Sequence, residues 1–135
     1  MRPTSILYFE RLSILSILVG MVFTWIEWES QLAGARASGL PPSVVPITLG
    51  FSLAVLLLLI FLISRKGIGI AKWIFVALFA LGFLFSVPQV LGALDRGLIG
   101  LLQLTQLVVQ GLAIYFLFTP EANDWFRRGG RTEAV

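Results

Sequence analysis

The segment SVVPITLGFSLAVLLLLIFLIS, residues 43–64, decides the fold of this chain. Its second half, residues 53–63, contains no polar side chain. An α-helix rises about 1.5 Å per residue, so about 20 residues cross a hydrocarbon core of about 30 Å. A segment of this length and composition therefore predicts a helix that spans a membrane.

Three further apolar blocks have the same character and cover residues 6–28, 70–92 and 98–118. Each is long enough to span a bilayer as a helix. Together the blocks leave little chain for anything else. The sequence therefore predicts an all-α fold, a four-transmembrane-helix antiparallel bundle that forms a single membrane domain over residues 1–135.

The links between the blocks support the same architecture. Residues 65–69 and 93–97 are short connections, which place consecutive helices side by side in opposite directions. The connection over residues 29–42 is longer and ends in a pair of prolines. We expect a short helix over residues 30–37 that stops before these prolines, because proline breaks a helix.

Composition excludes several classes of function. The chain of 135 residues is 58% hydrophobic and only 13% charged, whereas a soluble domain carries about 25% charged residues. It contains no cysteine and no histidine, which removes disulfides, thiolate or imidazole metal ligands and histidine acid–base catalysis. No paired carboxylates and no glycine-rich phosphate loop stand out. We expect no enzyme activity, no cofactor, no bound metal and no nucleic-acid partner.

The positions of the basic residues predict the topology. If the N-terminus is cytoplasmic, 8 of the 10 Lys and Arg residues fall on the cytoplasmic side. These are Arg2, Arg11, Arg65, Lys66, Lys72, Arg127, Arg128 and Arg131, against Arg36 and Arg96 outside. Positive residues remain on the cytoplasmic side of bacterial membrane proteins. The sequence thus predicts a cell inner membrane protein with both termini inside.

The segment after the last block predicts a short interfacial helix. Residues 119–121 are Thr-Pro-Glu, which is a cap residue, a first-turn proline and an acidic side chain that favours the start of a helix. We expect a helix over residues 120–127 on the cytoplasmic side, with Trp125 and Phe126 dipping toward lipid. Residues 129–135 are expected to lack regular structure.

The fourth block contains the main candidate site. Gln103, Gln106 and Gln110 are spaced by three and four residues, which places them on one helix face. The first block offers a complementary face of small and hydroxyl-bearing residues. They are Ser13, Ser16, Gly20 and Thr24.

We predict that these two faces pack together as a polar seam, since the residues match in depth. Two interpretations remain open. The amides serve as interhelical hydrogen-bond glue, or they line a path for a solute. A homodimer through the small-residue face of the first block is a competing use.

Glu10 is a secondary candidate because an ionisable residue within a spanning segment marks a functional site by default. It lies near the end of its helix, where a carboxylate finds a basic partner easily. We expect Glu10 to pair with Lys72 or Arg65. Binding of a proton or a cation is the alternative.

Two further candidates lie near the other membrane surface. Glu27, with Glu29 and Asp95, belongs to an acidic rim that attracts a cation or is simply solvated. Gln89 follows Pro88, whose missing N–H predicts a helix kink. We expect Gln89 to reach Gln103.

Several short motifs resemble those of small uncharacterised prokaryotic four-helix integral membrane proteins. They are Arg2-Pro3, Gly20, Arg65-Lys66, Ala71-Lys72-Trp73, Tyr115, Thr119-Pro120 and Trp125-Phe126. The resemblance implies the four-helix architecture and a bacterial inner-membrane setting. It implies no activity, cofactor or catalytic residue.

Three functional hypotheses follow from these observations. The first is an accessory or interaction subunit that forms a homo-oligomer or binds another membrane protein. The second is a transporter or channel for a small solute that uses the polar seam. The third is binding of membrane lipid or another hydrophobic ligand between the helices.

Overall fold

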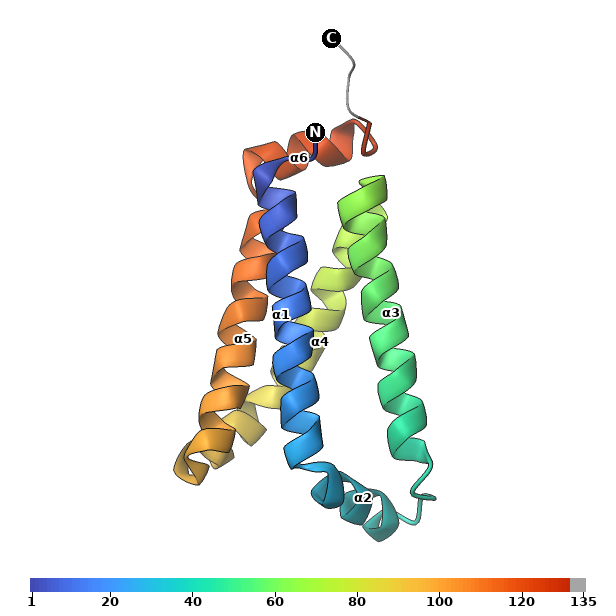
Figure 1. Cartoon of the computed structure of the whole chain (residues 1–135), viewed down its shortest axis with the longest axis vertical. Helices are drawn as coiled ribbons and strands as arrows, with labels where there is room; N and C mark the ends of the chain where they lie inside the picture. The colour runs from blue at the N-terminus through green and yellow to red at the C-terminus, as the bar shows by residue number, and fades with distance from the viewer. Residues whose placement is uncertain (132–135) are drawn as a thin grey trace.

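The computed structural model describes residues 1–131 and is all-helical there (Figure 1). The elements are α1 (Thr4–Ile26), α2 (Trp28–Ala37), α3 (Val44–Lys66), α4 (Gly69–Ala93), the 3₁₀ turn η1 (Leu94–Arg96), α5 (Leu98–Leu117) and α6 (Pro120–Arg127). Four helices are long and apolar enough to cross a membrane, namely α1, α3, α4 with η1, and α5. The prediction of four apolar helices is thereby confirmed.

The observed helix ends differ from the predicted ones by one or two residues at several places. α1 ends at Ile26, where the N–H of Glu27 donates to the carbonyl of Phe23 at 3.0 Å. The carbonyl of Glu27 then accepts from Gln31 at 3.0 Å, so α2 follows at once. The expected single span to residue 28 and the expected short helix from residue 30 are therefore both shifted.

The four long helices are not packed equally. Figure 1 shows α1 and α5 side by side along most of their length, and the contacts between them far outnumber those of any other helix pair. α4 starts next to α3 and passes obliquely behind α1 to reach α5 at the α2 end. α3 stands away from α1 toward that end, where α2 bridges the two. The arrangement is tight at the α6 end and open at the α2 end.

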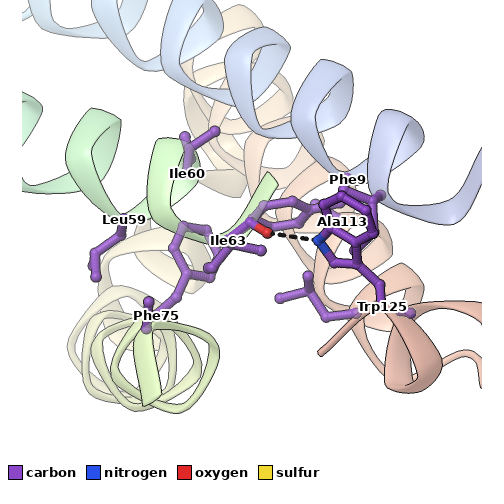
Figure 2. Packing of buried hydrophobic residues seen from close by; sticks show 11 residues of the cluster. Phe9, Leu59, Ile60, Ile63, Phe75, Ala113 and Trp125 are labelled. Atoms are coloured by element: carbon purple, nitrogen blue, oxygen red, sulfur yellow. Dashed lines mark hydrogen bonds between the residues drawn. The ribbon is translucent and has the colours of Figure 1, made fainter. Parts of the chain in front are cut away.

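The buried core lies at the α6 end. Phe9 of α1 meets Phe75 of α4 edge to face, with ring centroids 5.2 Å apart. Around this pair lie the other buried residues of the cluster (Figure 2). They are Ile6, Leu59, Ile60, Ile63, Ala71, Ala113, Leu117, Ala122 and Trp125.

Helix α6 closes this end of the molecule. Thr119 caps it by accepting a hydrogen bond from the N–H of Ala122 at 3.4 Å, as its sequence predicts. Trp125 is only 5% exposed, and its indole N–H donates to the carbonyl of Ile63 at 3.2 Å (Figure 2). The predicted contact of Trp125 with lipid is therefore wrong. Ile63 lies in the last turn of α3, where carbonyls have no helical partner, and the buried indole supplies one.

Two glycines fix the approach of the chain end to the α3–α4 connection. Gly67 ends α3 with φ +59°, and a Cβ atom there would lie 2.4 Å from the amide nitrogen of Gly130. The N–H of Gly130 in turn donates to the carbonyl of Trp125 at 3.2 Å. Residues 129–131 thus have a defined turn against the protein. The rest of the expected irregular tail, residues 132–135, lies outside the described residues.

Candidate functional site

The two predicted polar faces lie against each other where α1 meets α5. A Cβ atom on Gly20 would lie only 2.6 Å from Nε2 of Gln106, so the absence of a side chain lets the amide approach the α1 backbone. Ser13 and Ser16 are buried. The small-residue face of α1 is thus turned toward α5 within one molecule. A homodimer through this same face would require the two helices to separate.

Beside this seam lies a cavity of about 830 Å³ that we call the lateral cleft. It is walled by α1 and α3, reaches α2 at one end, and has Gln106 and Gln110 of α5 at its floor. The α1 residues that line it include the predicted Ser13, Ser16, Gly20 and Thr24. Six residues of α3 form the opposite wall. They are Leu49, Gly50, Ser52, Leu53, Leu56 and Ile60.

The polar groups in this region lack intramolecular partners. Among the described residues 1–131, none of the side-chain hydrogen bonds involves Gln103, Gln106 or Gln110. Oγ of Ser13 and Oε1 of Gln103 are buried with no partner. An amide or hydroxyl without a partner in an apolar medium costs about 2–7 kcal/mol. These groups are therefore free to bind water or a ligand, and the glue interpretation lacks its hydrogen bonds.

A second cavity of about 290 Å³, here the small cavity, lies behind the same glutamines. Gln89 and Gln103 both line it, but no hydrogen bond joins them, so the expected contact between the two side chains stays a prediction. The residues shared by both cavities are Phe23, Leu56, Phe75, Gln106 and Gln110. Gln106 and Gln110 therefore form a common polar wall between the two cavities.

Charge is nearly absent from the lateral cleft. Among the described residues that line it, Glu29 alone is ionisable, and it lies at the α2 end with Trp25 and Trp28. Glu27 follows the last residue of α1 as its C-cap but does not line the cleft. Within residues 1–131, no group of three or more acidic side chains is placed to hold a metal ion. The arrangement suits binding of a mostly apolar molecule rather than acid–base chemistry.

Glu10 lies away from the lateral cleft, near the α6 end. Its carboxylate pairs with Arg2 and lies 3.6 Å from Nη2 of Arg65, which is one of its two predicted partners. Lys72, the other predicted partner, instead donates to Oδ1 of Asn123 at 3.1 Å. The pair with Arg65 ties α1 to the end of α3, which favours a structural role.

Lys72 has surroundings that the sequence did not reveal. It is buried, and its ammonium lies 4.2 Å from the ring centre of Phe118 and 5.0 Å from that of Phe126. A cation over aromatic faces is attracted by the negative π surface. Together with the bond to Asn123, these contacts attach α6 to α4. Sequence reasoning did not connect Lys72 with Phe118 and Phe126, because the lysine is far from both phenylalanines in the chain.

The α3 wall of the lateral cleft was also missed by sequence reasoning. Gly50 and Ser52 are small residues near the start of a mostly bulky helix, and this was the only sign of the wall in the sequence. The presence of two small residues did not by itself predict a cavity, because small residues are common in membrane helices. Only the separation of α3 from α1 turns these positions into a wall.

Comparison with known proteins adds no relative. No family model, no curated protein and no solved structure matches the chain. The lateral cleft and its polar floor are therefore the basis for assigning a function.

Proposed function

We propose that this chain is a four-span antiparallel bundle in a bacterial inner membrane that binds a lipid-like amphiphile in its lateral cleft. Both termini and α6 lie on the cytoplasmic side. The observation that carries the ligand proposal is the lateral cleft itself. It has about 830 Å³ of space, largely apolar walls, and a floor formed by Gln106 and Gln110, whose amides take part in no side-chain hydrogen bond among the described residues.

Support for the orientation comes from the basic residues. The α6 end carries Arg2, Arg65, Lys66 and Arg127, whereas the α2 end carries Arg36 and, in η1, Arg96. This asymmetry favours a cytoplasmic α6 end because positive residues resist translocation. Helix α6 then lies at the cytoplasmic surface, where its exposed arginines face anionic headgroups.

Orientation can be measured cleanly, since the native chain has no cysteine. Thr4→Cys places a thiol at the α6 end and Ser38→Cys places one after α2, and both positions are exposed. In intact cells, a membrane-impermeant maleimide is expected to label the Ser38→Cys variant and not the Thr4→Cys variant. Both should be labelled after the cells are opened. Labelling of the Thr4→Cys variant alone in intact cells would reverse the proposed topology.

The dimensions and chemistry of the lateral cleft match a ligand site. Sites for small molecules are usually hollows of about 300–1,000 Å³ with apolar walls and a few converging polar groups. Here the walls come from α1 and α3, and the polar groups from Ser13, Gln106 and Gln110. A lipid chain reaches such a site directly from the bilayer, because the cleft lies between two helices that face it.

A larger side chain that fills the lateral cleft is expected to weaken lipid binding. A Cβ atom on Gly50 would meet nothing within 4 Å and would point into open space, so Gly50→Phe adds a ring without a clash. Gly111→Phe is the matched control, because Gly111 is equally unobstructed and lines neither cavity. We expect Gly50→Phe to weaken lipid binding about tenfold, which corresponds to about 1.4 kcal/mol.

The measurement is native mass spectrometry of the protein purified in mild detergent, with bound lipid counted per chain. The Gly111→Phe variant should retain the lipid of the native protein. Equal retention by the two variants would contradict binding in the lateral cleft.

An interaction subunit is the second candidate. Gly50 and Ser52 are exposed small residues on the α3 wall, and small residues let another helix approach closely. A partner helix would then occupy the lateral cleft in place of a lipid. The same mass measurement separates the two roles. A stable oligomer without lipid, lost in Gly50→Phe but kept in Gly111→Phe, would favour the interaction subunit.

A further inference from the structure

Among the residues that the structure describes, none that lines the lateral cleft could neutralise an anion. Its lining residues include no lysine and no arginine among the described residues, and its one ionisable side chain, Glu29, is acidic. An ion taken into an apolar site needs an opposite charge or it is strongly destabilised. A phosphate or carboxylate placed in the cleft would therefore lack a partner, and one placed at the α2 end would meet Glu29.

Side chains that can form hydrogen bonds with a ligand lie deep inside the lateral cleft. Ser13 is 3% exposed and its Oγ has no partner. Gln106 and Gln110 occupy the central turns of α5, so their amides lie far from either end of that helix. A hydroxyl and an amide both donate and accept, which suits an oxygen-bearing neutral group.

We infer that the ligand of the lateral cleft is an uncharged amphiphile whose hydroxyl or carbonyl oxygen bonds to Ser13 and Gln110. Its apolar chains lie along α3 between Leu49 and Leu56. This inference rests on the proposed function and goes beyond it by naming the chemical class. It separates neutral lipids of the diacylglycerol type from the charged phospholipids that surround the protein.

Two tryptophans provide the readout for a test. Trp25 and Trp28 line the lateral cleft, whereas Trp73 and Trp125 are not among its lining residues. Lipid chains that carry bromine quench tryptophan fluorescence on contact. The test uses three probes with brominated eighteen-carbon chains in detergent solution. They are a diacylglycerol, the phosphatidic acid with the same two chains, and the plain brominated hydrocarbon.

The diacylglycerol is expected to quench with a dissociation constant about tenfold lower than either other probe. A tenfold difference corresponds to about 1.4 kcal/mol, which is the size expected from two hydrogen bonds. The plain hydrocarbon lacks these bonds, and the phosphatidic acid brings a charge without a partner.

Substitutions at Ser13 and Gln110 test whether these side chains cause the preference for diacylglycerol. Ser13→Ala removes only the orphan hydroxyl, so its folding should be intact, and we expect diacylglycerol affinity to fall about fivefold. Gln110→Leu should act in the same direction. Hydrocarbon affinity should stay within twofold in both. Gln103→Leu is the control, because Gln103 lines the small cavity and not the lateral cleft.

The outcomes separate the two proposals. Equal quenching by all three probes that Gly50→Phe abolishes would overturn the neutral-ligand inference and leave the proposed function intact. Stronger quenching by phosphatidic acid than by diacylglycerol would also overturn it. No quenching by any probe would overturn the inference together with the proposed function.

Discussion

Gly100→Ala is expected to destabilise the protein by about 2–3 kcal/mol, which is the usual cost of forcing extra atoms into a packed site. A Cβ atom at this position would lie 2.3 Å from the carbonyl oxygen of Ala93 and 2.9 Å from its carbon. Both are backbone atoms at the end of α4, so no side-chain rotation relieves the clash. The end of α4 and the start of α5 must move apart.

Gly111→Ala is the matched control for this prediction. Gly111 lies in the same helix, but a Cβ atom there would meet nothing within 4 Å. Alanine favours a helix over glycine by about 1 kcal/mol, so the control should be neutral or more stable than the native protein. Equilibrium unfolding in mixed micelles, followed by circular dichroism, measures both variants. Equal stabilities of the two variants would contradict the close approach of α4 and α5.

Trp125→Ala is expected to cost about 3–5 kcal/mol, the usual range for removing a buried tryptophan. Trp125 is 5% exposed and packs in the core at the α6 end. Its loss removes this packing and leaves the carbonyl of Ile63 without its donor. Hydrogen exchange of the α6 amides should rise in the same variant, because this side chain holds α6 against α3.

Two comparison variants separate the contributions that packing and hydrogen bonding of Trp125 make to stability. Trp125→Phe keeps most of the ring volume and loses the hydrogen bond, so about 1–2 kcal/mol of the cost should remain. Trp25→Ala removes the same side chain from a position that is 84% exposed and should change stability little. A Trp125→Ala variant as stable as the Trp25→Ala variant would show that α6 does not dock as described.

Trp125 also shows why sequence reasoning failed at the α6 end. The segment has the pattern of an interfacial helix, and an aromatic pair on such a helix ordinarily faces lipid. Whether it faces lipid or protein depends on what lies beneath the helix. Here the ends of α3 and α4 lie there, and they offer the free carbonyl of Ile63 and the buried ammonium of Lys72. Neither contact leaves a local trace, because the partners are about 50 to 60 residues away in the chain.

The glutamine face illustrates a partial success. Spacing alone put Gln103, Gln106 and Gln110 on one side of their helix, and the match with small residues placed Gly20 opposite Gln106. Sequence reasoning left open whether such amides bond across the interface or line a path for a solute. In the structure they line two cavities. Spacing determines which way a side chain points, but whether space is left in front of it depends on neighbouring helices.

The four apolar blocks, of which residues 43–64 are the clearest, were sufficient by themselves to determine the long helices of this protein. A helix long enough to cross a bilayer satisfies its own backbone within one segment, so its existence follows from local composition. The angle between α3 and α1 does not, because it is the sum of many weak contacts with other helices. That angle opens the lateral cleft and exposes Gly50 to it, so the candidate ligand site was decided only by the tertiary structure.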